Sequence, residues 1–138
     1  MVDPDSLIDE GTNLAELGNI DDALKLFEEA LNIDPNNARG WHSKGIVMSS
    51  KGMFREAIDY YDRAIGINPG YVKALNNKGA SLHGLGKSEE AMKCFKEALR
   101  IEPDDLFAML NLGKMFYVLG NVDDALRFYD RVIEMEPD

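Results

Sequence analysis

The sequence repeats itself every 34 residues, and no other feature constrains the fold as strongly. The step separates four prolines, Pro35, Pro69, Pro103 and Pro137. It also separates two series of glycines, one of alanines and one of aromatic residues: Gly11, Gly45, Gly79, Gly113; Gly18, Gly52, Gly86, Gly120; Ala23, Ala57, Ala91, Ala125; Phe27, Tyr61, Phe95, Tyr129. Because five series keep one period without an insertion, chance is excluded. A fixed period in this range indicates stacked repeats.

Each repeat is predicted to hold two helices. In the third repeat, apolar or small residues recur at helical spacing up to Gly86, which interrupts the pattern. The pattern then restarts, with Ser88 as the expected N-cap and Pro103 as the stop that pushes Glu102 into an extended conformation. A single pair of such helices cannot bury its apolar stripes, but a stack of four pairs can.

Small residues are expected to bring the two helices of a repeat close together. Gly79 and Ala91 lie on facing stripes of the third repeat, and Phe95 is expected to fill the wedge between them. The other repeats place a glycine, an alanine and an aromatic ring at the same positions. The sequence therefore predicts close antiparallel pairs of one common design.

This pattern resembles the tetratricopeptide repeat (TPR) family over residues 4–138. The residues that carry the resemblance are the series above together with Trp41 and its counterparts Leu7, Leu75 and Met109; Leu14, Met48, Leu82 and Phe116; and Ala30, Ala64 and Ala98. The sequence departs from the family pattern at Glu10, Lys44 and Lys78, where leucine is usual, and at Val132. The resemblance implies an all-α solenoid, a right-handed superhelical array with a concave groove, forming one domain (1–138) of repeats 4–37, 38–71, 72–105 and 106–138.

Composition excludes several classes of function. The formal net charge of −10 argues against a nucleic-acid partner, and no apolar run is long enough to cross a membrane. One cysteine and two histidines cannot supply a His/Cys metal cluster, and no phosphate-binding loop or activated nucleophile is present. We therefore expect no enzyme activity, cofactor or metal. The acidic start is unlike a signal peptide, and the single Cys94 fits a cytoplasmic setting.

The resemblance implies a protein-interaction scaffold that binds a peptide or protein segment along the first helices. The positions that face the groove in the family run here from acidic, through cationic and amide-rich, to apolar. The expected ligand-contacting residues are Arg39, His42, Lys73, Asn76, Asn77, Phe107, Leu110, Asn111, Lys114 and Tyr117. Asn77 and Asn111 match the asparagines with which some TPR proteins hold a peptide backbone, and the cations favour an acidic or carboxylate-bearing segment.

A sharper family mechanism does not fit. TPR co-chaperones grip the terminal carboxylate of heat-shock chaperones with lysine, asparagine and arginine side chains at five positions. Read from the first repeat, those positions hold Ile8, Thr12, Ser43, Lys73 and Asn77; read from the second, they hold His42, Ile46, Asn77, Phe107 and Asn111. Only one residue of each set fits, so this clamp is not expected.

The first helix of the fourth repeat is apolar nearly all round, as a buried helix is. We expect an apolar face toward the position of a next repeat, formed by Leu112, Met115, Leu119, Ile133 and Met135. Two alternatives to a groove-binding scaffold remain open. The chain is either a self-assembly module, forming a homo-oligomer through this C-terminal face, or a fragment of a longer TPR array.

Overall fold

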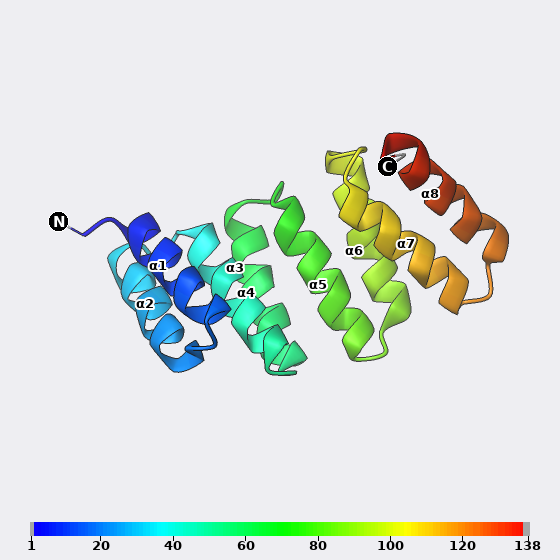
Figure 1. Cartoon of the computed structure of the whole chain (residues 1–138). Coiled ribbons are helices and arrows are strands. Elements are labelled where there is room, and N and C mark those ends of the chain that lie inside the picture. The colour runs from blue at the N-terminus through cyan, green and yellow to red at the C-terminus, as the bar shows by residue number, and fades with distance from the viewer. Residues whose placement is uncertain (1, 137–138) are drawn as a thin grey trace. The chain divides into compact units, whose positions relative to one another are not determined.

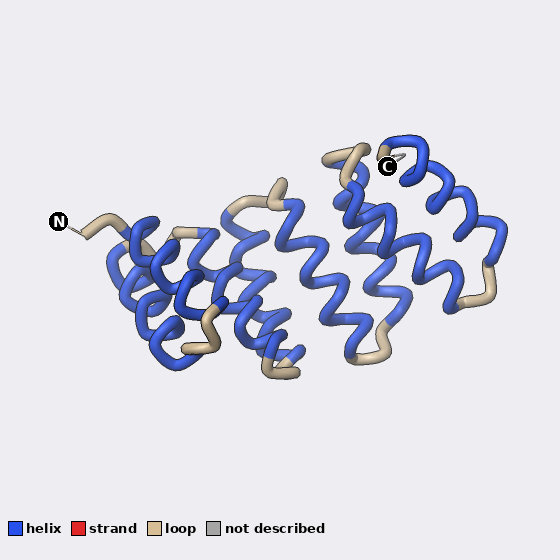
Figure 2. Tube along the Cα trace, in the orientation of Figure 1, coloured by secondary structure: helices blue, strands red, loops and turns tan. Residues whose placement is uncertain are grey.

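The structure is a computed structural model that describes residues 2–136, and within them it consists of eight helices without strands. The helices are α1 (Pro4–Glu16), α2 (Ile20–Ile33), α3 (Ala38–Ser50), α4 (Phe54–Ile67), α5 (Val72–Gly84), α6 (Ser88–Ile101), α7 (Leu106–Val118) and α8 (Val122–Met135). Short loops join them throughout, as Figures 1 and 2 show. The predicted all-α fold of helix pairs is confirmed. The last proline of the series, Pro137, lies outside the described residues.

The chain divides into two compact units, residues 1–74 and 75–138, so that the boundary falls within α5. In the first unit α1 packs against α2, α3 packs against α4, and α3 also packs against both helices of the first repeat. Its core is formed by buried side chains of α1, α2, α3 and α4, among them Ile8, Phe27, Val47 and Tyr61. In the second unit α7 packs against both α6 and α8.

The repeated small residues set how closely paired helices approach. A Cβ atom added to Gly79 of α5 would lie 2.7 Å from Cε1 of Phe95 in α6, nearer than real Cβ contacts allow. Phe95 is buried, so its ring has little room to move. The aromatic ring therefore lies directly on the glycine backbone, as the sequence predicts.

Glycines with positive φ end the first helix of every repeat. Gly86 follows α5 with φ +80°, a conformation that L side chains rarely adopt. At the other end of the repeat, Glu102 has φ −124° and ψ 92°, the extended conformation expected before Pro103. Both predicted breaks are confirmed.

The predicted N-cap at Ser88 is wrong. Ser88 is already the first residue of α6, and its N-cap is Lys87, which makes no side-chain cap hydrogen bond. Side-chain caps instead begin the first helix of the first, second and fourth repeats. Asp3, Asn37 and Asp105 accept hydrogen bonds from the backbone N–H groups of Asp5, Gly40 and Ala108 at 3.1, 3.3 and 2.9 Å. These caps satisfy N–H groups that a helix cannot satisfy itself.

Candidate functional site

The predicted ligand-contacting residues are distributed over both units. Arg39, His42 and Lys73 belong to the first unit, whereas seven residues of α5 and α7 belong to the second: Asn76, Asn77, Phe107, Leu110, Asn111, Lys114 and Tyr117. Their surroundings within each unit decide which of them can contact a ligand.

Arg39 is already paired with acidic side chains. Its Nη2 atom lies 2.6 Å from Oδ1 of Asp9, and its Nη1 atom lies 3.4 Å from Oδ1 of Asp5. The hydrogen bond to Asp9 raises the pKa of Arg39. Asn37 donates a further hydrogen bond of 3.0 Å to Asp5, so α1 and the start of α3 are joined by a polar network. Arg39 is therefore not a free cation waiting for an acidic ligand.

His42 lies in the interior, so the expectation that it faces a ligand is wrong. Its side chain is 7% exposed, and its ring packs against the rings of Tyr61 and Tyr71. The Tyr71 hydroxyl lies 3.2 Å from Nδ1 of His42. Burial, followed by the charges of Lys73 and Arg39, lowers the pKa of His42 to about 4. The ring is thus neutral near pH 7. Lys73 itself is exposed.

Asn76 has a structural task that its sequence position does not reveal. It is buried, and its Nδ2 atom donates a hydrogen bond of 2.7 Å to Oδ2 of Asp105. That same carboxylate caps α7 by accepting from the N–H of Ala108. Asn76 thereby ties α5 to the start of α7. Its Oδ1 atom is buried without a hydrogen-bond partner among the described residues.

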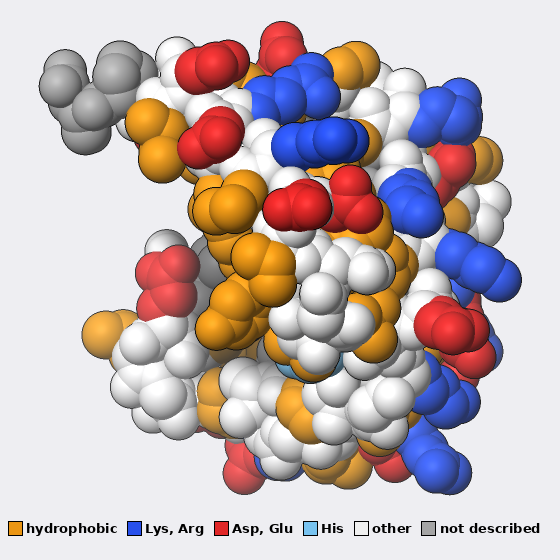
Figure 3. Space-filling model, turned by 90° about the vertical axis from the view of Figure 1, so that its right-hand side faces the viewer, with side chains coloured by type: hydrophobic (Ala, Val, Ile, Leu, Met, Phe, Trp, Pro, Cys, Tyr) orange, Lys and Arg blue, Asp and Glu red, His pale blue; other side chains and the backbone are white. Residues whose placement is uncertain are grey.

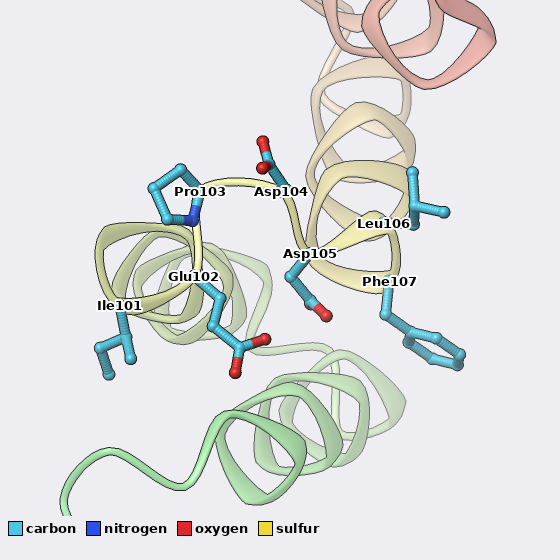
Figure 4. Close-up of a pocket in the computed structure, with 7 residues that line it drawn as sticks. All are labelled: Ile101, Glu102, Pro103, Asp104, Asp105, Leu106 and Phe107. Carbon is cyan, nitrogen blue, oxygen red and sulfur yellow. The ribbon is translucent and has the colours of Figure 1, made fainter. Parts of the chain in front are cut away.

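The loop that carries Asp105 borders a shallow acidic hollow. Residues 101–107 line a space of about 590 Å³ between the end of α6 and the start of α7. Figure 4 shows the carboxylates of Glu102 and Asp105 turned to the same side of this loop, whereas the ring of Phe107 points away from it. Asp105 is already hydrogen-bonded to Asn76 and to the backbone N–H of Ala108, and so holds the start of α7 in place. The hollow therefore does not present a free carboxylate pair.

One side of α7 carries a mostly apolar stripe that reaches the surface. Phe107 is 65% exposed and Tyr117 is 63% exposed. The spacing of three and four residues places the stripe's members along one side of the helix. We call this surface the α7 stripe; it comprises Phe107, Leu110, Asn111, Lys114, Tyr117 and Val118. Large apolar side chains are seldom exposed together in this way without a binding role.

The amides of Asn77 and Asn111 are each half-buried. Asn111 lies within the α7 stripe, whereas Asn77 lies on α5. Lys114 is exposed in the same stripe and makes no ion pair among those found for the described residues. Apolar, amide and cationic groups therefore alternate along α7.

The expectation that Leu112 and Met115 lie on an open C-terminal face is wrong. Both are 1% exposed. Their counterparts 68 residues earlier are Lys44 and Val47 of α3, and Val47 belongs to a core that includes Phe27 and Ala23 of the preceding repeat. These two positions of a repeat therefore face the preceding repeat. On α7 they are buried in the second unit, where α7 packs against α6.

The other three residues of that expected face are exposed. Leu119, Ile133 and Met135 lie at or near the surface of the last helix pair, and Ile133 is 60% exposed. Sequence reasoning missed two neighbours on α8, Val122 and Leu126, which are also exposed. The signal was available, since Leu126 occupies the repeat position of Leu24, Ile58 and Met92, all apolar.

No group of three or more His, Cys, Asp or Glu side chains among residues 2–136 could hold a metal ion. No helix in that range is long and apolar enough to cross a membrane.

Four matches to tetratricopeptide repeat models identify the family. Models described as TPR repeat or tetratricopeptide repeat match residues 11–52, 38–71, 72–105 and 107–138. The helix pairs and the family models together define an all-α repeat solenoid. The chain belongs to the tetratricopeptide repeat family. No curated protein matches the chain.

Several solved structures share this fold. A crystal structure of MamA is similar with a TM-score of 0.86 and 22% identity, covering 97% of this chain and 78% of that chain. MamA from Desulfovibrio magneticus RS-1, residues 41 to the end, gives 0.85 and 23%, with 98% and 76% covered. The first TPR of Spaghetti (RPAP3), bound to an HSP90 peptide, gives 0.80 and 26%, with 85% and 93% covered.

Proposed function

We propose that this protein is a non-catalytic interaction scaffold that binds an extended peptide segment along α5 and α7 of its second unit. The observation that carries the proposal is the α7 stripe, in which Phe107, Leu110 and Tyr117 are exposed beside Lys114. A TPR structure of similar fold holds a peptide, the HSP90 segment bound to Spaghetti (RPAP3). Repeat solenoids expose extended surfaces of this kind for binding.

The ligand's chemistry follows from the side chains that line the stripe. Phe107 and Tyr117 supply apolar area for side chains of the peptide. The amides of Asn77 and Asn111 supply donors and acceptors for its backbone. Lys114 favours a carboxylate near the middle of the bound segment. The proposed ligand is therefore an extended peptide with apolar residues on either side of an acidic one.

A chaperone-tail clamp of the co-chaperone kind is not part of this proposal. The position that would need a lysine in the first repeat holds Ile8, which is buried. Arg39, a cation of the second repeat, is neutralised by Asp5 and Asp9. Of the clamp positions read from the first repeat, only Lys73 carries a cation, which is fewer positive charges than a two-carboxylate clamp takes.

The test is selection of peptides from a displayed library, followed by affinity measurement on purified chain. Asn77→Ala with Asn111→Ala should weaken binding at least tenfold, because each lost hydrogen bond leaves a desolvated partner and costs about 1–3 kcal/mol. Asn32→Ala with Asn36→Ala is the matched control, since both asparagines are exposed on the first unit. Thermal melts of both variants check folding. Equal affinity of the wild type and the Asn77/Asn111 variant would refute the proposed site.

A further inference from the structure

The last helix exposes an apolar row that the structure leaves uncovered. Val122, Leu126 and Ile133 recur at spacings of four and seven along α8, and Leu119 in the preceding turn extends the row. We call these four residues the α8 face. Figure 3 looks onto the end of the chain that carries α8 and shows hydrophobic side chains at the surface among acidic and basic ones. Leu119 directly follows Val118, the last residue of the α7 stripe, whereas the other three residues lie on α8.

Two of these repeat positions, those of Leu126 and Ile133, are less exposed where another repeat follows, whereas the counterpart of Leu119 in the first repeat, Leu17, is itself 75% exposed. Leu126 and Ile133 correspond to Leu24 and Leu31 of α2, and to Met92 and Leu99 of α6. Leu31 is 7% exposed and Met92 is 9% exposed, whereas Leu126 is 53% exposed. In the first unit the covering element is α3, which packs against α2. Leu126 and Ile133 thus lie at a junction surface of the repeat that no helix among residues 2–136 covers.

The junction between α2 and α3 shows what kind of helix fits. Gly40 lies against Leu31, since a Cβ atom added to Gly40 would come within 2.8 Å of Cδ2 of Leu31. Lys44, one turn later, places Nζ 3.9 Å from Oε1 of Glu28. Val47 is buried in the core of the two repeats. One side of the covering helix therefore carries three residues in order. The first is small, the second is basic and four positions later, and the third is apolar and three positions after that.

The α8 face has residues equivalent to those with which α2 contacts α3 at this junction. Ile133 occupies the position of Leu31, and Asp130 occupies the position of Glu28. Asp130 is exposed. Asp123 and Glu134 flank the same edge of the apolar row, because residues seven and four positions from Asp130 lie on its side of the helix. Arg127, three residues from Asp130, lies on this edge as well, with its Nη1 atom 3.8 Å from Oδ1 of Asp124. The three carboxylates outnumber this one guanidinium, so charge complementarity favours a basic helix.

A second copy of the chain does not fit this face. Its helix α1 carries Ser6, Glu10 and Asn13 at the positions of Gly40, Lys44 and Val47. Glu10 would then meet Asp130, and Asn13 would enter an apolar core. Pairing two α8 helices antiparallel would place the acidic edge of each against that of the other. Both arrangements bring like charges together and desolvate polar groups.

We infer that the α8 face docks an amphipathic helix of a partner protein, with a small residue against Ile133, a lysine or arginine against Asp130 and an apolar residue three positions beyond that base. The apolar row supplies the area and the acidic edge fixes the register of the helix. The partner binds as a helix on a helix pair, a mode that recurs in peptide recognition.

The probe is a labelled helical peptide of about 21 residues carrying the Ala-x3-Lys-x2-Val pattern on one side, long enough to form a helix when bound. Fluorescence anisotropy should show binding to the whole chain, weakened at least tenfold by Asp130→Lys. Changing the peptide's lysine to glutamate should weaken binding to the wild type and restore it to Asp130→Lys. Asp59→Lys, an exposed position on α4 with the same charge change, is the matched control.

Two further measurements keep the test decisive. Ile133→Asp changes an exposed side chain, so the chain should stay folded by circular dichroism and lose the peptide. The Asn77/Asn111 variant should bind the peptide normally, which separates this inference from the groove proposal. Absence of binding, equal binding by Asp130→Lys, or sedimentation showing a wild-type dimer that Ile133→Asp dissociates would overturn the inference.

Discussion

At the scale of single residues, burial decides which polar side chains support the fold and which are left for a ligand. His42 and Asn76 stand at positions that face the groove in the family, yet both are buried and engaged by Tyr71 and Asp105. Lys114 stands at a comparable position and is exposed. Residue type alone does not separate these cases, because the neighbour that engages each side chain comes from a distant part of the chain.

His42 makes stability depend on pH. Its pKa is lowered from 6.5 to about 4 in the folded chain, so the unfolded chain binds the proton more readily. Its stabilising contribution is complete above pH 6.5 and is lost as pH falls from 6.5 toward 4. Urea unfolding at pH 7.5 and 4.5 should show the stability advantage of wild type over His42→Gln narrowing by about 2–3 kcal/mol. Carboxylates titrate in both proteins, so their effect cancels when the unfolding free energies of wild type and His42→Gln are subtracted. A difference that does not change with pH would contradict the neutral buried ring.

At the scale of elements, three of the first helices, α1, α3 and α7, begin at side-chain caps, whereas the second helices rely on packing. Asp3, Asn37 and Asp105 cap α1, α3 and α7 with side-chain hydrogen bonds. Helices α2, α4, α6 and α8 have none at their N-termini. An isolated helix of this length is only marginally stable in water, so the second helices are held in place by their burial against the first helices.

The cap of α7 should be energetically coupled to Asn76. Asp105→Ala removes the cap and should cost about 1–2 kcal/mol of unfolding free energy. It also leaves the buried Nδ2 of Asn76 without Asp105, so Asn76→Ala should cost less in the Asp105→Ala background than in wild type. Urea unfolding of both single variants and the double variant gives the coupling. Strictly additive losses would mean that the 2.7 Å hydrogen bond contributes nothing.

At the scale of the whole molecule, the first repeat is stabilised by the second within the first unit, and the third by the fourth within the second unit. In the first unit α3 covers α2, and in the second unit α7 covers α6. Nearest-neighbour contacts of this kind make stability a sum over junctions. The junction side of α8 is the exception, since its apolar row is exposed.

Removal of residues 103–138 should therefore destabilise what remains. The truncated chain 1–102 would expose Met92, which is now buried, and would deprive Asn76 of Asp105. Its urea midpoint should fall below that of the full chain, because a junction is lost along with the deleted residues. Circular dichroism and fluorescence should report one shifted transition. A midpoint equal to that of the full chain would show that the repeats do not stabilise one another.

The sequence by itself determined the period, the helix pairs and their turns. Those features depend on local chemistry, such as Gly86 at a positive φ and Pro103 after an extended Glu102, and on the repetition of small and aromatic residues. The same repetition carried the family resemblance that the repeat models bear out. The N-cap at Ser88 was wrong because Lys87 serves without a side-chain hydrogen bond, a difference of one residue that local pattern does not resolve.

Only the tertiary structure decided which way each apolar side chain faces. Leu112 and Ile133 are both apolar residues of the fourth repeat, yet one is 1% exposed and the other 60% exposed. The physical reason is that a helix in a repeat array contacts neighbours on several sides, and its sequence does not state which neighbour lies on which side. Packing of α7 on α6 buries Leu112, whereas no helix among residues 2–136 covers Ile133 on α8.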